Sequence, residues 1–92
     1  MRLLSDNDYR LLQELLTAHP DAGATIKGTG GIRKLRWAGQ GQGKRGGVRV
    51  VYFWAMAKDR ILMLFMYPKS ERDDLSPEQL KILLKIVEQE EK

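Results

Sequence analysis

The fold is decided by residues 28–67, which read GTGGIRKLRWAGQGQGKRGGVRVVYFWAMAKDRILMLFMY. Three runs rich in apolar residues lie within this stretch, at positions 32–37, 48–55 and 61–67. Each run has the length of an ordinary β-strand, and a glycine-rich loop separates the first two. The run at 48–55 is largely apolar on both of its faces, which is typical of a central strand covered on both sides. The stretch therefore predicts an antiparallel sheet of three strands or more.

A helix is predicted before this sheet. Ser5 stands at a capping position with Asp8 three residues further on, and leucines then recur at helical spacing between Leu11 and Leu16. Pro20 disfavours a helical conformation for the residue before it. The helix is therefore predicted to end near position 19.

A second helix is predicted after the sheet. Ser76, Pro77 and Gln79 have the order of a helix cap, a first helical residue and the second member of a capping box. Apolar residues at positions 80, 83, 84 and 87 give this helix one buried stripe, and residues 88–92 are predicted to fray. Two helices and an antiparallel sheet place the chain in the α+β class, as one domain over residues 1–92.

Composition excludes several kinds of site. The chain has no cysteine, which excludes disulfides, thiolate nucleophiles and cysteine-bound metal clusters. His19 is the single histidine, and its place before a proline at a helix end favours a structural or solvent-exposed role over a catalytic one. The adjacent acids Asp73 and Asp74 precede a helix and are predicted to act as electrostatic caps. We expect no metal and no cofactor.

The sequence also gives no sign of a membrane segment. No apolar run approaches the ~20 residues that cross a bilayer. The first residues, MRLLSDND, turn acidic at once, unlike a signal peptide. We expect a cytoplasmic protein that does not enter a membrane.

Positive charge is concentrated on the predicted sheet. Nine lysines and arginines between positions 27 and 60 face a single acid, Asp59, whereas both flanks are slightly acidic. Such a field is typical of a surface that binds nucleic acid. Alternation along the first strand places Lys34 and Arg36 on one face, and the glycine-rich loop would carry Lys44 and Arg45 to a nucleic-acid backbone.

Arg49 lies within the predicted central strand. A charge is costly to bury there without an anion. Arg49 is therefore predicted either to line the floor of an open cleft or to pair with an acid.

The residues suit one reaction in particular, the attack of an RNA 2′-hydroxyl on its neighbouring phosphate. The sequence has no Cys–His pair, no HExxH and no GxSxG, and one histidine cannot form a two-histidine relay. In this reaction the substrate carries the nucleophile, and the protein holds it in line and neutralises the charge that develops on the phosphate. Neighbouring cations disfavour the ammonium form of a lysine, and Lys34 is flanked by Arg33 and shares a face with Arg36.

Two other functions fit the same residues. A non-catalytic nucleic-acid-binding module would grip phosphates with these cations and stack bases on Tyr52 and Tyr67. An interaction domain would meet an acidic protein segment with the same basic face. The residues alone leave all three functions open.

The blocks GTGGIRKLRWA, GKRGGVRVVYFW and ILMLFMYPKSERDDLSPEQL, in this order, resemble the RelE superfamily of type II toxin–antitoxin toxins, and its HigB branch most closely. The resemblance covers residues 5–87. It implies a small RelE-like fold and a ribosome-dependent mRNA endoribonuclease, which enters the decoding site of the 30S ribosomal subunit, cuts the mRNA there and inhibits translation. It also implies a cognate HigA-like helix-turn-helix antitoxin, through which the pair would bind its operator DNA.

The resemblance implies roles for individual residues as well. Lys34 is similar to a family lysine proposed for proton transfer or charge stabilisation, with Arg36 beside it, and Arg49 is similar to the arginine aimed at the scissile phosphate. Lys69 and Arg72 fall in the segment that supplies a further catalytic cation. We therefore predict Lys34, Arg36, Arg49 and Lys69 as catalytic residues, and Lys44, Arg45, Tyr67 and Arg72 as RNA-binding residues.

The chain departs from the RelE pattern in three places. Ser70 stands where RelE has an arginine, and Tyr67 would have to replace a tyrosine near the C-terminal end of RelE. Relatives begin with an extra strand and a longer first helix. We accordingly expect a sheet that lacks one strand and exposes an edge prone to pairing.

Overall fold

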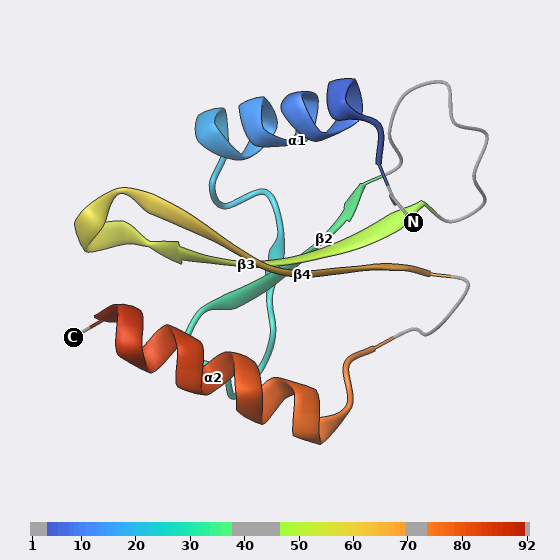
Figure 1. The fold of residues 1–92 in the computed structure, drawn as a ribbon. Coiled ribbons are helices and arrows are strands. Elements are labelled where there is room, and N and C mark those ends of the chain that lie inside the picture. The colour runs from blue at the N-terminus through green and yellow to red at the C-terminus, as the bar shows by residue number, and fades with distance from the viewer. Residues whose placement is uncertain (1–3, 38–46, 70–73, 92) are drawn as a thin grey trace.

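An antiparallel sheet lies between two helices in a computed structural model of the chain, which describes residues 4–37, 47–69 and 74–91. Figure 1 shows the sheet nearly edge-on, with α1 on one side and α2 on the other. The elements are, in chain order, α1 (Asp6–Ala18), β1 (Ala24–Thr25), β2 (Ile32–Trp37), β3 (Val48–Ala55), the short 3₁₀ turn η1 (Met56–Lys58), β4 (Arg60–Pro68) and α2 (Pro77–Glu91).

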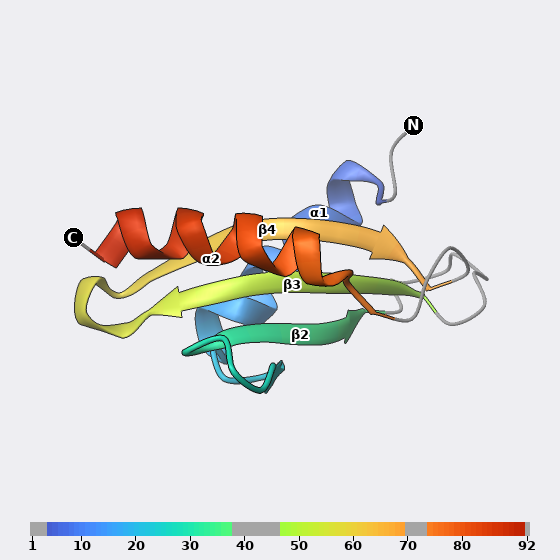
Figure 2. The same ribbon diagram turned by 90° about the horizontal axis from the view of Figure 1, so that it is seen from below.

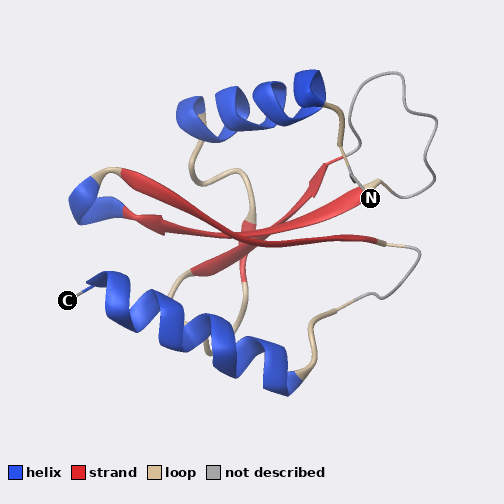
Figure 3. Ribbon diagram, viewed as in Figure 1, coloured by secondary structure: helices blue, strands red, loops and turns tan. Residues whose placement is uncertain are grey.

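The sheet has four strands in the order β1-β2-β3-β4, and each neighbouring pair is antiparallel (Figure 3). The predicted α+β class is therefore confirmed. β1 is the strand that the sequence did not predict, because an alanine and a threonine alone form no alternating pattern. It exists through its pairing with β2, where Ala24 lies opposite Lys34. Within the described residues, β1 and β4 form the two edges of the sheet.

Both helices begin at the caps that the sequence predicted. The backbone N–H of Asp8 donates to Ser5 Oγ at 3.1 Å, and α1 ends at Ala18 with His19 as its C-cap. At α2 the capping box is reciprocal: the N–H of Gln79 donates to Ser76 Oγ at 3.2 Å, and the N–H of Ser76 donates to Gln79 Oε1 at 2.9 Å. These bonds satisfy backbone donors that a helix start leaves unpaired.

The far end of α2 differs from its prediction. Residues 88–91 were expected to fray, but the helix continues to Glu91. The reason is tertiary, because Glu90 accepts a hydrogen bond from Arg60 at 2.6 Å and also binds Lys58. These contacts tie the last turn of α2 to the hairpin between β3 and β4.

β3 is buried along nearly its whole length, as expected for a central strand. One of its faces packs against α1, and the other packs against α2. The core under α1 is formed by Leu12, Leu16, Val48, Val50 and Tyr52, and the core under α2 by Ile32, Val51, Phe53, Ala55, Tyr67, Leu83 and Val87. The sheet therefore separates two apolar layers, and each helix closes one of them.

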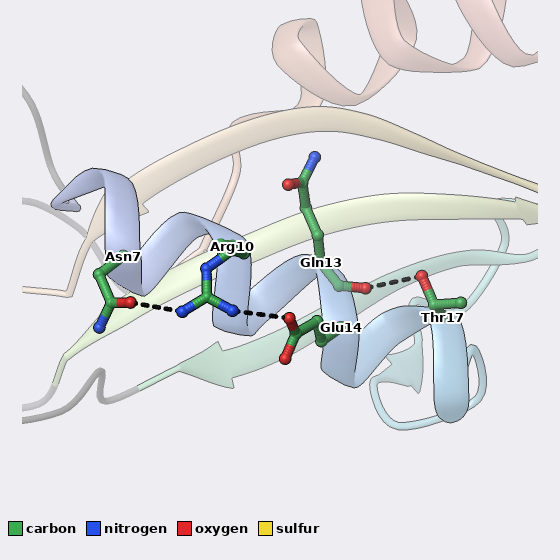
Figure 4. A network of polar contacts seen from close by, with 5 residues as sticks. All are labelled: Asn7, Arg10, Gln13, Glu14 and Thr17. Atoms are coloured by element: carbon green, nitrogen blue, oxygen red, sulfur yellow. Dashed lines mark hydrogen bonds and ion pairs between the residues drawn. The ribbon is translucent and has the colours of Figure 1, made fainter.

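The outer face of α1 carries polar contacts within the helix (Figure 4). Arg10 donates to Asn7 Oδ1 at 2.7 Å and to Glu14 Oε2 at 2.8 Å, and Thr17 Oγ1 donates to the carbonyl oxygen of Gln13 at 2.8 Å. This pattern agrees with a helix that buries one stripe and exposes the other. No helix in the described ranges is long and apolar enough to cross a membrane.

Candidate active site

Strand pairing aligns two arginines and a tyrosine in one row. Arg36 on β2 lies directly opposite Arg49 on β3, and Arg49 lies opposite Tyr67 on β4. Residues that face each other across antiparallel strands project to the same side of the sheet. Tyr67 belongs to the core under α2, so the row lies on the face that α2 covers in part. Lys34 projects from the same face, two residues before Arg36.

The row lies near one end of the sheet. Arg49 is the second residue of β3, and Tyr67 is the last but one of β4. In Figure 2, where α2 lies over β3 and β4, the helix begins toward the end of the sheet at which β3 starts and β4 finishes. The first turn of α2 and the row therefore lie toward the same end of the molecule.

Burial differs sharply along the row. Arg49 is only 7% exposed and Tyr67 only 3%, whereas Arg36 is exposed. Arg49 and Tyr67 both take part in interactions with other groups of the protein. Two like charges directly opposite each other on neighbouring strands repel. The row thus brings two cations together on one face of the sheet, of which Arg36 is the one open to solvent.

Lys34 is joined to an acid that the sequence did not connect with it. Its ammonium forms an ion pair with Asp74, in the segment that precedes α2. The two residues are 40 positions apart in the chain, so no local pattern relates them. Asp74 was predicted as an electrostatic cap only, and the fold brings it into contact with Lys34.

A family model described as the RelE toxin of the RelE/RelB toxin–antitoxin system matches residues 8–91. The chain belongs to the RelE toxin family. The match extends from the third residue of α1 to the end of α2 and includes the whole sheet, so the predicted superfamily is confirmed, and the chain is a toxin of a toxin–antitoxin system. The assignment to the HigB branch stays a prediction.

The remaining predicted site residues of this RelE-family toxin fall into two groups. Lys69 is exposed two residues after Tyr67, and its backbone N–H donates to the carbonyl oxygen of Gly47 at 3.3 Å, which holds it at the same end of the sheet. Three predicted RNA-binding residues, Lys44, Arg45 and Arg72, lie outside the described residues, as do Ser70 and Asp73.

Tyr67 lies in the row with Arg36 and Arg49, but its ring is buried and not open to solvent. The ring centroids of Tyr67 and Phe65 are 5.8 Å apart, and Tyr67 is buried in the core under α2. Tyr52, the other tyrosine considered for base stacking, lies in the core under α1. Neither ring is exposed for stacking on a base, so the contact of Tyr67 with RNA stays a prediction that would require the ring to move.

Other candidate sites lie away from the row or are not formed. His19 is exposed at the end of α1, on the opposite face of the sheet, in line with the solvent-exposed role among its two predicted alternatives. Among the described residues, no group of three or more His, Cys, Asp or Glu side chains is arranged to hold a metal ion.

Proposed function

We propose that this toxin is an endoribonuclease that cuts mRNA on the ribosome through attack of an RNA 2′-hydroxyl. The observation that carries the proposal is the row in which Arg36 lies opposite Arg49, with Lys34 on the same face of the sheet. Membership of the RelE family supports it, because that family supplies the toxins of a toxin–antitoxin system. The cations would bind the scissile phosphate and the phosphates beside it.

The reaction gives different tasks to the arginines of the row and to the lysines near it. The 2′-hydroxyl loses its proton as its oxygen forms a bond to phosphorus, the bond from phosphorus to the 5′-oxygen breaks and that oxygen gains a proton, and the products end in a 2′,3′-cyclic phosphate and a 5′-hydroxyl. Arg49 is held by burial within the sheet, so it is suited to stabilise the charge of the transition state from a fixed position. Arg36, Lys34 and Lys69 are more exposed and would complete the binding of the phosphate backbone.

The proposed partners follow from the same assignment. The substrate is mRNA bound to the 30S ribosomal subunit, which places the toxin in the cytoplasm. Lys44, Arg45, Tyr67 and Arg72 are proposed to contact RNA, and Lys69 to act with the catalytic cations. The cognate antitoxin is proposed to be a HigA-like helix-turn-helix protein, through which the pair would reach operator DNA.

The test is the mapping of mRNA 5′ ends after brief expression of the wild type and of Arg49→Ala and Arg36→Ala. We expect new 5′ ends within translated messages for the wild type, and a loss of about 10²–10³-fold in cleavage for Arg49→Ala, the usual cost of removing a group that stabilises the transition state. Arg10→Ala is the matched control, because it removes an exposed arginine from α1 on the opposite face. Circular dichroism and thermal melting establish that each variant is folded.

The outcomes separate the candidate functions. Wild-type cleavage by both row variants would show that the row is wrongly assigned. Unchanged message lengths with the wild type, together with binding to RNA, would identify a non-catalytic nucleic-acid-binding module. Cleavage that occurs equally on free mRNA would contradict the dependence on the ribosome.

A further inference from the structure

We propose that Asp74 is a built-in counterion of Lys34, which an RNA phosphate has to displace, so that this carboxylate lowers the affinity for RNA of the face of the sheet that carries Lys34, Arg36 and Arg49. Asp74 acts here as a positioning residue, since it would hold the Lys34 ammonium in place until the ligand arrives. The inference rests on the proposed function only in taking RNA as the ligand.

The fold leaves the Lys34 side chain only partly open to solvent. It lies in β2, with β1 on one side and β3 on the other, and its paired residue on β3 is the apolar Val51. Only 31% of its side chain is exposed. The aliphatic part of such a lysine packs on apolar surface, while the ammonium extends to polar partners. In the structure that partner is Asp74.

Asp74 is held at this point by the residues that follow it. Leu75 packs against the core under α2, and directly afterwards Ser76 and Gln79 close the capping box. The backbone that follows Asp74 is thereby fixed. The carboxylate is still 75% exposed, so the ion pair is open to an incoming ligand on its outer side.

A phosphate and the carboxylate would compete for the same ammonium. Both are anions that accept charge-assisted hydrogen bonds from a lysine, and they repel each other at close range. Exposed ion pairs are weak, shifting an equilibrium by only a few-fold. A contact of this strength keeps Lys34 in position at rest and is still readily replaced. Arg36 and Arg49, on the same face, would attract the phosphate that replaces it.

The test measures binding of an RNA hexanucleotide that is 2′-O-methylated throughout and therefore cannot be cleaved by 2′-attack. We expect Asp74→Asn to lower the Kd for this RNA about two- to five-fold at low salt, as expected for the loss of one exposed ion pair. In a Lys34→Met background the same substitution should give no tightening. Glu78→Gln, which removes an acid from the first turn of α2, is the control and should have a smaller effect that does not depend on Lys34.

The inference is overturned if Asp74→Asn leaves the Kd unchanged, if its effect equals that of Glu78→Gln, or if its effect persists without Lys34. Because the ligand cannot be cut, this result is independent of catalysis. Tighter binding that depends on Lys34, in a protein that fails to cleave mRNA, would support the counterion and refute the endoribonuclease. Cleavage of mRNA by a protein that shows no Lys34-dependent tightening would refute the counterion alone.

Discussion

Tyr52 shows how a single side chain secures the connection between α1 and the sheet. It is 0% exposed in the centre of β3. Its hydroxyl donates to the carbonyl oxygen of Pro20 at 2.7 Å and accepts from the backbone N–H of Gly23 at 2.8 Å. A β-carbon on Gly23 would lie 3.0 Å from this hydroxyl and from the carbonyl oxygen of Lys34, so the close approach favours glycine. The tyrosine is thus a fixed structural element and not a base-stacking platform.

We expect Tyr52→Phe to lower the free energy of unfolding by about 1–3 kcal/mol, the cost of leaving a buried donor or acceptor without its partner. The substitution keeps the ring and removes only the hydroxyl, so the loss is assigned to the bonds with Pro20 and Gly23. Urea unfolding measures it. Tyr9→Phe is the control, because Tyr9 is exposed on α1. Equal stability of the two variants would contradict the assigned role.

At the scale of elements, the first turn of α2 is tied to the site because it directly follows Asp74 and Leu75, the latter packed against the core under α2. We expect Ser76→Ala to cost about 0.5–2 kcal/mol of stability, the usual cost of losing a helix cap. Since Ser76 Oγ accepts the hydrogen bond that the N–H of Gln79 donates, amide hydrogen exchange of Gln79 and Leu80 should accelerate.

Ser5→Ala removes the cap of α1 and serves as the control for this prediction. It should reduce stability by a similar amount while leaving local exchange at the start of α2 unchanged. Uniform acceleration of exchange throughout the chain in both variants would show global loosening and no local role of the box.

The elements also show which parts of the fold are predictable from sequence. Caps and alternation are local signals, so they located α1, β2, β3 and the start of α2 to within a residue or two. β1 and the last turn of α2 depend on partners distant in the chain, namely the backbone of β2 and the cations Lys58 and Arg60. Alternation also placed Lys34 and Arg36 on one face, but the alignment of Arg36 with Arg49 depends on strand register, and the contact of Lys34 with Asp74 depends on the position of α2.

At the scale of the whole molecule, the sheet divides the chain into two faces with different chemistry. On one side α1 closes its core and exposes polar residues of both signs, among them Arg10 and Glu14. On the other side α2 covers one apolar layer, and Lys34, Arg36 and Arg49 project from the same face of the strands. A net charge of +4 spread evenly would attract RNA to any surface. The alignment of Lys34, Arg36 and Arg49 on one face predicts that binding depends on position as well as on charge.

This dependence can be measured through salt. A single strand contributes about −0.7 to the slope of the logarithm of the binding constant against the logarithm of salt concentration for each phosphate that a protein neutralises. If three or four cations on the α2 side of the sheet each neutralise a phosphate of the 2′-O-methylated hexanucleotide, this slope should be about −2 to −3. Arg36→Met should make the slope shallower by about 0.7, since one phosphate contact is lost. Arg10→Met removes the same charge from α1, so it should leave the slope unchanged, and titrations at four salt concentrations distinguish the two variants. Equal slopes for both variants would mean that RNA responds to the total charge of the molecule, and the row of cations across the sheet would then have no special part in binding.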